Sequence, residues 1–338
     1  MKKTNPSMTQ HLIFGAGLIG GFMAASFSAK GLRVSVLGRE KYRQRFSADL
    51  LATDYAGQRM VGNGIVFFSD PKQIEDRLFD FIWLTVKSTG LEQALKEVAP
   101  LVAPQTVLIS CQNGLGSEQR LKQAFPKHRV LRAIMQSNVA DLGMAHLHRG
   151  SQGRFEVEEY LIGDQSLAEL INTPVLPSAS VLDVQAYAWA KLQLNLGNAV
   201  NALANVPVRE MLANRGYRKI IASAMRELLL VADHKHIQLP KISAVPMKLM
   251  PSILSLPNFL FEIVGQSMLK VDPTVRTSMW WDLHNKRLTE IDYLNGAVVD
   301  AAISAGIACP MNQRIVELVH QMEENEQHTA LPAKEFYQ

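Results

Sequence analysis

A lysine and two asparagines recur at helical spacing in "WAKLQLNLGNAVNAL", a stretch that is otherwise mostly apolar. A helix advances about 100° per residue, so Lys191, Asn195 and Asn198 fall within about 60° of one another and form one polar stripe. Polar groups on a mostly buried helix face require partners. The stripe is therefore either a satisfied structural network, a solvated stripe, or part of a reactive site.

If the stripe faces a ligand cleft, its chemistry is that of carbonyl reduction. Hydride addition to a carbonyl leaves an alkoxide that must be protonated. A partly desolvated lysine, its pKa below the usual value of about 10.4, can supply that proton. Lys191 is then the candidate proton donor, and Asn195 and Asn198 can hold a carbonyl or carboxylate without adding charge.

A second polar cluster occurs in "RTSMWWDLHNKRLTEIDYLNG", a segment with a helical pattern. Asp282 and Arg287 are expected to make structural ion pairs or helix contacts, and His284 is expected to be structural. Ser278 and Glu290 remain as candidates for the site.

A glycine-rich turn near the start of the chain predicts a site for a dinucleotide. Gly15, Gly17 and Gly20 stand between the apolar run "HLIF" and a helical pattern, which is the context that a G-x-G-x-x-G motif requires. The first glycine permits a tight turn, the second lets the backbone approach a pyrophosphate, and the third allows close packing of helix on strand. The helix N-terminus then favours the anion.

The end of the second predicted strand, "VLGRE", indicates which dinucleotide binds. An acidic residue there would accept hydrogen bonds from the ribose of NAD, whereas this chain has Gly38 and then Arg39. A guanidinium can bind a 2′-phosphate bidentately and stack on adenine. We therefore expect NADPH, unless Glu40 rather than Arg39 faces the ribose.

Two further strands end in polar residues. Lys87 follows "FIWLTV", and Asn113 follows "VLISCQ" and precedes the turn glycines Gly114 and Gly116. Taken alone, Lys87 reads as a solvated loop residue and Asn113 as a turn former. Because ligands bind at the carboxyl ends of strands in an open α/β sheet, together they are candidates for the nicotinamide side of the cofactor and the substrate.

The elements that position these residues define an α/β chain with two parts. We expect parallel strands at 79–86, 106–111 and 129–136, an antiparallel extension at one edge over 153–164, and a helix that begins near Leu91. Beyond about residue 188, helical patterns occupy 189–213, 216–236, 242–269, 273–304 and 311–324. The prediction is an NADP-binding, Rossmann-type, mostly parallel sheet domain over 1–185, an all-helical substrate and catalytic domain over 186–338, a ligand cleft between them, and a frayed C-terminal end.

Composition is consistent with an ordinary globular protein. The 338 residues carry 35 Lys and Arg against 31 Asp and Glu, and a net charge of +4 is too weak for nucleic-acid binding but suits small anionic ligands. Two cysteines, Cys111 and Cys309, are too few for a disulfide framework or a zinc site and favour the cytoplasm. We expect no metal, no membrane span and no signal peptide, although the apolar stretch after Lys2 and Lys3 superficially resembles one.

In order along nearly the whole chain, the motifs "GAGLIGG", "VKS", "QNGLG", "WAKLQLN" and "TSM..D....R.TEIDYLNG" resemble those of the ketopantoate reductases (2-dehydropantoate 2-reductases). The resemblance implies reduction of ketopantoate to pantoate, for coenzyme A synthesis, with closure of the two domains over the ligands. It implies that Lys191 is the proton donor, that Asn195 and Ser278 hold substrate, and that Glu290 lies where cofactor and substrate meet. The cofactor residues that it implies are Gly15, Ala16, Gly17, Leu18, Ile19 and Gly20 at the pyrophosphate, Arg39 at the 2′-phosphate, and Lys87 and Asn113.

The chain departs from the family pattern at substrate positions. Members commonly have an asparagine where this chain has Ala199, and Asn198 is the expected replacement; a further family asparagine falls on Val208 or Arg209. The stretch 241–271 is also long. These departures leave open a different 2-oxoacid or an amino acid derivative as substrate, as well as an NADPH-binding regulator without turnover. A homodimer is left open as the assembly.

Overall fold

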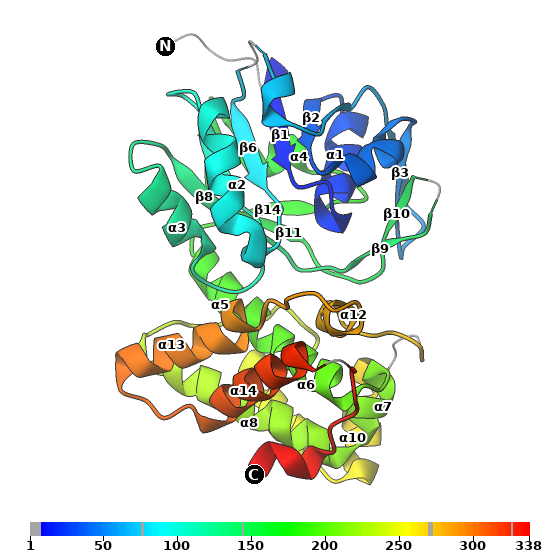
Figure 1. Ribbon diagram of the computed structural model, residues 1–338, viewed down its shortest axis with the longest axis vertical. Coiled ribbons are helices and arrows are strands. Elements are labelled where there is room, and N and C mark those ends of the chain that lie inside the picture. The colour runs from blue at the N-terminus through cyan, green and yellow to red at the C-terminus, as the bar shows by residue number, and fades with distance from the viewer. Residues whose placement is uncertain (1–7, 76–77, 144, 270–272, 326) are drawn as a thin grey trace. The chain divides into compact units, whose positions relative to one another are not determined.

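The computed structural model describes residues 8–75, 78–143, 145–269, 273–325 and 327–338. The chain divides into two compact units: a sheet unit of Met1–Gln112 and Gly116–Val184, and a helical unit of Asn113–Leu115 and Gln185–Gln338. The first contains a mostly parallel sheet with helices and the second is built from helices (Figure 1). The predicted fold class is confirmed.

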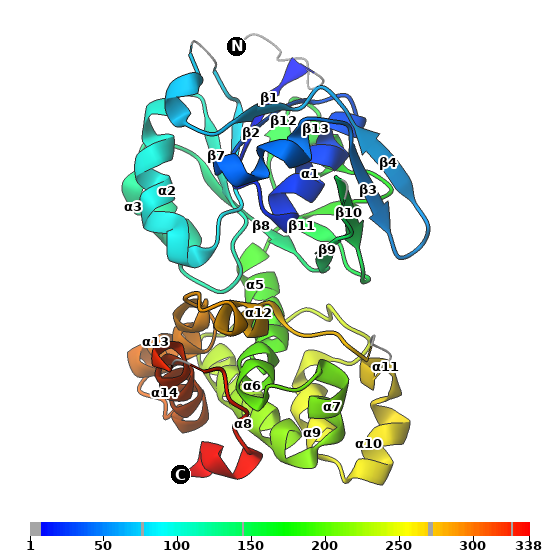
Figure 2. The same ribbon diagram turned by 45° about the vertical axis from the view of Figure 1, so that its right-hand side comes forward.

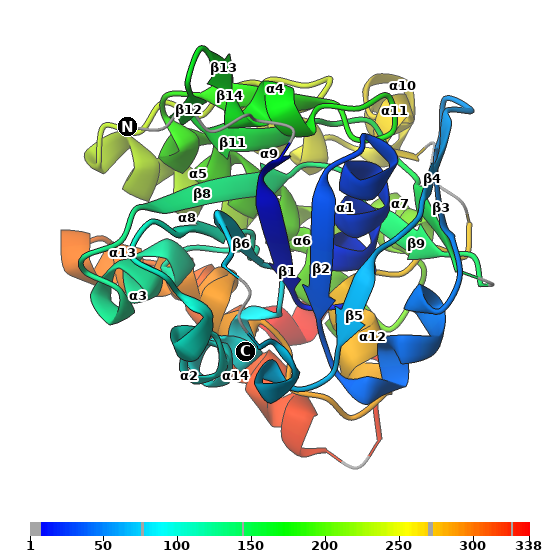
Figure 3. The same cartoon turned by 90° about the horizontal axis from the view of Figure 1, so that it is seen from above.

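In the described part of the sheet unit, the main sheet has eight strands in the order β14-β11-β8-β7-β6-β1-β2-β5 (Figure 3). Its strands are β1 (Gln10–Phe14), β2 (Arg33–Leu37), β5 (Val66–Phe68), β6 (Phe81–Leu84), β7 (Val107–Ser110), β8 (Val130–Met135), β11 (Phe155–Glu158) and β14 (Ser178–Val181). Neighbouring strands pair in parallel, apart from the antiparallel pair β8 and β11. Strands β6, β7 and β8 are buried along their whole length, as the near-continuous apolar sequences around β6 and β7 predict for those two.

Helices cover both faces of this sheet, and each face has its own apolar core. They are α1 (Leu18–Ala29), α2 (Leu91–Val98), α3 (Ser117–Ala124) and α4 (Leu167–Ile171). Phe22 and Met23 of α1 share one core with Trp83 of β6, whereas Leu91 of α2 shares the other with Leu84 of the same strand. Short 3₁₀ segments are η2 (Glu40–Phe46), η3 (Pro71–Gln73), η4 (Ser88–Gly90) and η5 (Ala99–Leu101).

A second, four-stranded sheet that the sequence did not predict packs on α1 (Figure 2). Its strands, in spatial order, are β4 (Arg59–Gly62), β3 (Leu50–Asp54), β10 (His146–Arg149) and β9 (Val139–Asp141), and a small hairpin adds β12 (Leu161–Ile162) and β13 (Gln165–Ser166). The approach to α1 is close, since a Cβ atom on Gly62 would lie 2.6 Å from the carbonyl oxygen of Ala25. Helix α1 is therefore held on both sides.

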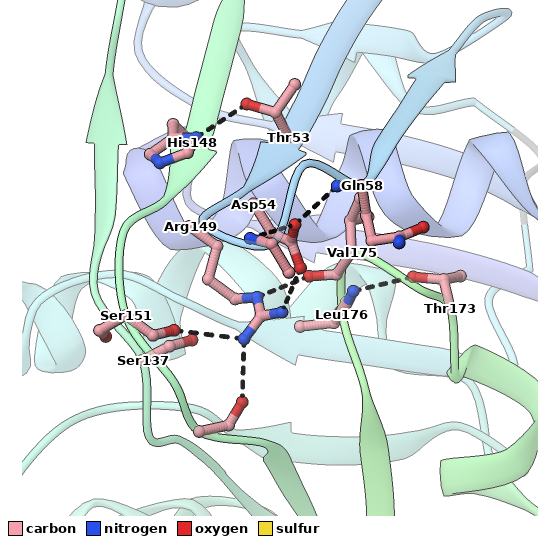
Figure 4. Close-up of polar contacts among 12 residues, drawn as sticks. Thr53, Asp54, Gln58, Ser137, His148, Arg149, Ser151, Thr173, Val175 and Leu176 are labelled. Carbon is pink, nitrogen blue, oxygen red and sulfur yellow. Dashed lines mark hydrogen bonds and ion pairs between the residues drawn. The ribbon is translucent and has the colours of Figure 1, made fainter.

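A buried ion pair joins β3 to β10 in this second sheet (Figure 4). The Arg149 Nη2 atom lies 2.7 Å from Asp54 Oδ2, and the two side chains are only 3% and 2% exposed. Arg149 also donates to the carbonyl oxygens of Val175, Ser151 and Gly153, while Asp54 accepts from the backbone N–H groups of Ala56 and Gln58. Both charges are thus hydrogen-bonded as well as paired, which burial of charge requires.

The helical unit surrounds α8 (Arg215–His234), whose apolar residues lie in the unit's core. The other helices are α5 (Val184–Asn195), α6 (Gly197–Ala204), α7 (Val208–Ala213), α9 (Met250–Ser255), α10 (Asn258–Val264), α11 (Gln266–Leu269), α12 (Ser278–His284), α13 (Asn295–Ala305) and α14 (Pro310–Glu324), with η6 (Met247–Leu249), η7 (Ile291–Tyr293) and η8 (Ala333–Tyr337). Within the described residues, none of the helices is long and apolar enough to span a membrane.

Several helices of this unit are shorter than the stretches that the sequence predicted as helical. The stretch 189–213 is divided after Asn195 and again after Ala204, where Asn205 has a φ of +52° and Pro207 precedes α7. In 242–269, Pro257 separates α9 from α10, and Gly265 separates α10 from α11. The buried Arg218 guanidinium organises this region, because it donates to carbonyl oxygens at the ends of α7 and α9.

The prediction of a frayed C-terminal end is wrong. Leu331 donates its N–H to the carbonyl oxygen of Leu203 over 2.8 Å, and the Tyr217 hydroxyl donates to the carbonyl oxygen of Leu331. Phe336 is only 1% exposed and packs edge-on against Tyr217. One aromatic anchor and two hydrogen bonds thus fix a tail whose sequence is mostly polar.

Candidate functional site

The glycine turn after β1 has a backbone that only glycine adopts easily. Gly15 has a φ of +124°, and its N–H donates to the carbonyl oxygen of Leu37 over 2.8 Å. The Thr85 hydroxyl donates to the carbonyl oxygen of Gly15 over 2.8 Å, and a Cβ atom on Gly15 would lie 2.7 Å from that same hydroxyl. The turn is therefore fixed between β1, β2 and the end of β6.

The other two glycines of the motif differ in their surroundings. A Cβ atom on Gly20 would overlap the carbonyl oxygen of Gly15, so α1 packs too closely on the turn for any side chain. A Cβ atom on Gly17, at the start of α1, would meet no described atom within 4 Å. Of the described side chains, none caps α1 and none in its first turn is acidic. The open N–H groups and positive end of α1 can therefore hold an anion.

The remaining residues of the motif are Ala16, which precedes α1, and Leu18 and Ile19 in its first turn. Ala16 is buried, Leu18 is exposed and Ile19 is half-buried. Arg45, which the sequence analysis did not select, donates from Nη1 to the carbonyl oxygen of Ala16 over 3.1 Å and pairs with Asp141 of β9. Arg45 lies in the basic segment "EKYRQRF", so its charge was visible in the sequence, but its contact with the turn depends on the path of η2.

Arg39 and Glu40 follow β2 and have different environments. Arg39 is exposed, with its guanidinium carbon 5.8 Å from the centroid of the Tyr42 ring. Glu40 is bound by Arg43, whose Nε and Nη2 atoms donate to its carboxylate over 2.5 and 3.0 Å. These hydrogen bonds lower the pKa of Glu40. Glu40, the alternative ligand for a ribose hydroxyl, therefore has its carboxylate paired with Arg43.

Lys87 and Asn113 belong to different units. Lys87 is exposed at the start of η4, just beyond β6. Asn113 is exposed and lies in the tripeptide Asn113–Leu115, which clusters with the helical unit. Leu115 donates its N–H to the carbonyl oxygen of Tyr293 over 3.3 Å, and a Cβ atom on Gly114 would overlap that oxygen. Asn113 is therefore held against η7.

The polar stripe of Lys191, Asn195 and Asn198 bridges the junction of α5 and α6. Helix α5 ends at Asn195 and α6 begins at Gly197, so the stripe runs over two helices rather than one. The Asn198 Nδ2 atom still lies 3.5 Å from Asn195 Oδ1, which keeps these two amides together. Burial lowers the pKa of Lys191 to about 8, so this ammonium group releases its proton far more readily than an exposed lysine.

Ser278 starts α12 beside this stripe. The preceding residue, Thr277, donates its N–H to Asn201 Oδ1 over 3.1 Å and its hydroxyl to the carbonyl oxygen of Asn198 over 3.2 Å. The Thr277 side chain also caps α12. Ser278 is exposed at this capped end. Thr277 and Asn201 thus bring Ser278 and Asn198 together. The sequence analysis selected neither Thr277 nor Asn201, because the partners of Thr277 lie 76 or more residues away in the chain.

Glu290 lies at the start of η7 and is half-buried. Its carbonyl oxygen accepts hydrogen bonds from the N–H groups of Tyr293 and Leu294, both at 3.1 Å. The Tyr293 carbonyl oxygen also accepts the N–H of Leu115 in the Asn113–Leu115 tripeptide, so the backbone of Tyr293 contacts both Glu290 and this tripeptide. The exposed His284 stacks on Trp280 at a centroid distance of 4.5 Å.

Two sets of groups result, each with a distinct chemical capability. In the sheet unit, the N-terminus of α1 and the Arg39 guanidinium suit a ligand with a pyrophosphate and a further phosphate. In the helical unit, a lysine of lowered pKa accompanies asparagine amides and a serine hydroxyl. These are the groups that protonate an alkoxide and hold a carbonyl or carboxylate.

Comparison with known proteins identifies relatives that span nearly the whole chain. A family model described as ketopantoate reductase PanE/ApbA matches residues 11–161, and one described as ketopantoate reductase PanE/ApbA C terminal matches residues 183–323. The 2-dehydropantoate 2-reductase of Archaeoglobus fulgidus is 24% identical over 318 residues, which cover 92% of this chain and 97% of that protein.

Solved structures share the fold. A PanE/ApbA family ketopantoate reductase from Ralstonia eutropha JMP134 has a TM-score of 0.76 and 23% identity, covering 94% of this chain and 99% of that one. The ternary structure of a D-mandelate dehydrogenase with NADH and anilino(oxo)acetate has a TM-score of 0.73 and 21% identity, covering 93% and 99%. One architecture therefore serves proteins named for different substrates.

Proposed function

Because the chain belongs to the ketopantoate reductase family, we propose that it catalyses the NADPH-dependent reduction of 2-dehydropantoate to pantoate, a step that serves coenzyme A synthesis. The family consists of oxidoreductases that act on CH–OH groups with a nicotinamide dinucleotide. The substrate, the choice of NADPH and the roles of individual residues are the parts that we propose.

We propose that residues 1–185, which include the sheet unit, form the NADP-binding domain. Gly15, Ala16, Gly17, Leu18, Ile19 and Gly20 line the pyrophosphate. The open N-terminus of α1 supports this role, because N–H groups without a side-chain cap favour an anion. Arg39 binds the 2′-phosphate, and the pairing of Glu40 with Arg43 supports NADPH over NADH. Lys87 and Asn113 contact the cofactor.

Residues 186–338, which make up most of the helical unit, are proposed to form the substrate and catalytic domain. A reduced nicotinamide, when bound, would supply the hydride for C2 of the 2-oxoacid. Lys191 donates its Nζ proton to the C2 oxygen as negative charge develops there. Asn195, Asn198 and Ser278 hold the carbonyl and carboxylate of the substrate, and Asn113 contributes an amide. Glu290 lies where substrate and cofactor meet.

The single observation that carries this proposal is the lowered pKa of Lys191, to about 8, beside the paired amides of Asn195 and Asn198. A general acid works best when its pKa lies near the operating pH, since it is then both protonated and able to give up the proton. An ordinary lysine, with a pKa of about 10.4, meets only the first condition.

A second candidate is the reduction of a different 2-oxoacid. Ala199, fully buried in α6, stands where the family commonly has an asparagine, and a D-mandelate dehydrogenase shares the fold. Asn198 lies next to this position and within 3.5 Å of Asn195, which supports its role as a replacement. A cytoplasmic location and a homodimeric assembly stay predictions from the sequence.

The experiment that tests the function is a panel of 2-oxoacids, with and without amines, assayed with NADPH and with NADH. We expect the highest kcat/KM for ketopantoate with NADPH. A higher value for another 2-oxoacid supports the second candidate instead, and amine-dependent turnover indicates an opine-type dehydrogenase. NADPH binding without oxidation by any substrate of the panel would contradict an enzymatic function.

A further inference from the structure

The backbone on either side of Glu290 is held by two side chains of α14. The N–H of Thr289 donates to Glu323 Oε1 over 2.7 Å. Two residues beyond Glu290, Asp292 Oδ1 lies 2.9 Å from His320 Nε2. The other ring nitrogen of His320 lies 3.2 Å from Glu323 Oε2. Glu323, His320 and Asp292 therefore form one connected clamp, which spans the segment that carries Glu290.

Glu323 is the buried end of this clamp. Its side chain is 11% exposed, whereas those of His320 and Asp292 are 44% and 63% exposed. The Thr289 N–H that it accepts belongs to a buried residue, and the Thr289 hydroxyl accepts the N–H of Ile291 over 3.2 Å. Loss of the Glu323 carboxylate would leave a buried N–H without its partner, which is costly enough to displace the segment.

His320 orients the Glu323 carboxylate from the outer side. Partial burial lowers the pKa of His320, but the hydrogen bonds and charges of Asp292 and Glu323 raise it more, and the net shift is upward. A protonated imidazole donates from both ring nitrogens, so it can bind both carboxylates at once.

We propose that Glu323, oriented by His320, is a positioning residue for Glu290, an inference that rests on the proposed function of Glu290 in the site. Glu323 acts through the backbone of Thr289 and touches neither substrate nor cofactor in this role.

Variants of α14 distinguish a role of Glu323 in positioning Glu290 from a role in the general stability of the fold. Glu323→Ala removes the acceptor for Thr289, whereas Glu323→Gln keeps a carbonyl oxygen that can accept that N–H. The matched control is Glu317→Ala, because Glu317 lies on the same helix, where its carboxylate accepts a hydrogen bond from Gln313 and pairs with Arg314. We expect kcat to fall about 10- to 100-fold in Glu323→Ala, since small displacements of catalytic groups have effects of this size.

The expected pattern is a split between kinetic constants. In Glu323→Ala, kcat falls while the KM for NADPH changes less than about twofold, Glu323→Gln recovers most of the rate, and Glu317→Ala behaves as wild type. In a Glu290→Gln background, Glu323→Ala should have little further effect, because both changes act on one group. Independent, multiplicative losses in the double variant would overturn the proposal.

Hydrogen exchange supplies a readout that does not depend on turnover. The Thr289 amide should exchange faster in Glu323→Ala than in wild type and in Glu317→Ala, with the amides of α8 unchanged. An unchanged Thr289 amide would overturn the clamp whatever the activity. If wild type reduces none of the 2-oxoacids, the proposed function fails, and this exchange measurement alone decides whether Glu323 holds the segment.

Discussion

At the scale of single residues, Lys191 owes its proposed role to where α5 places it. The same side chain on an exposed helix face would stay protonated well above neutral pH. Burial lowers its pKa to about 8, and the asparagines one and two turns later bring amides rather than charges. The lysine therefore keeps a proton at neutral pH that it can transfer in the reaction.

The lowered pKa of Lys191 predicts the pH dependence of the reaction. Reduction needs the protonated lysine, so kcat/KM for the 2-oxoacid should be level below about pH 7 and fall roughly tenfold per pH unit above about 8. The reverse oxidation needs the neutral amine, so its rate should rise over the same range. In Lys191→Arg the residual rate should not show this decrease above about pH 8, because a guanidinium stays charged. An identical decrease in wild type and Lys191→Arg would mean that another group causes it.

Arg39 predicts the preference between the two nicotinamide cofactors. Arg39→Ala should weaken NADPH binding by about 1 to 3 kcal/mol, the range for hydrogen bonds to a charged group, and change NADH binding little. Fluorescence titration of both cofactors measures the difference. Lys41→Ala is the control, because Lys41 belongs to the same basic segment and is exposed. Equal losses for the two cofactors in Arg39→Ala would show that this residue does not contact the phosphate.

The sequence identified residues whose role depends on local context and missed those whose partners are distant. The glycines, Arg39 and Lys191 stand in motifs of adjacent residues. Thr277 and Glu323, in contrast, act on segments 76 and 34 residues away in the chain. Their side chains are unremarkable in sequence, and only the folded chain brings them to their partners.

At the scale of elements, the N-terminus of α1 depends on two glycines with opposite requirements. Gly20 is needed because α1 packs on the turn without space for a Cβ atom, whereas the Cβ position of Gly17 is open. The backbone of Gly17, with a φ of −71°, is one that alanine can adopt. Substitutions at these two positions can therefore distinguish an effect on folding from an effect on ligand binding.

We expect Gly20→Ala to lower the melting temperature, because the added Cβ atom would overlap the carbonyl oxygen of Gly15. Gly17→Ala should leave the melting temperature nearly unchanged and weaken cofactor binding, since its Cβ atom would occupy the space through which a pyrophosphate approaches the backbone. Thermal unfolding and cofactor titration of both variants test this. Undiminished cofactor affinity in Gly17→Ala would contradict the placement of the pyrophosphate.

The apolar strands were predicted correctly, and the strands of mixed polarity in the second sheet were not. Strands β6 and β7 lie in near-continuous apolar runs, and β6, β7 and β8 are buried along their whole length. The second sheet has strands of mixed polarity, and β10 pairs with β3 across more than 90 residues of chain. Helix ends were also hard to place, because the division between α5 and α6 at Leu196 has neither a proline nor a glycine before it.

At the scale of the whole molecule, each unit has its own buried polar network as well as its own apolar core. In the sheet unit the network centres on Asp54 and Arg149. In the helical unit Glu227 accepts the N–H groups of Met311 and Asn312 at the start of α14. Neither network was predictable, because buried charges have no periodic pattern in sequence.

Breaking the first of these networks should destabilise the sheet unit strongly. Arg149→Met leaves the Asp54 carboxylate buried without its ion-pair partner, and the expected loss in the free energy of unfolding is about 3 to 5 kcal/mol. The control is Glu92→Gln, which removes the exposed pair with Arg120 and should cost less than about 1 kcal/mol. Urea unfolding measures both, and similar small losses would show that the buried pair contributes little.

The most direct test of the proposed chemistry is the turnover of Lys191→Ala with ketopantoate and NADPH. Lys219→Ala is the control, because Lys219 is an exposed lysine on α8. We predict that kcat falls about 10²- to 10⁴-fold in Lys191→Ala, the usual contribution of a positioned acid, while NADPH affinity and the Lys219→Ala rate stay close to wild type. Turnover of Lys191→Ala at the wild-type rate would contradict the account.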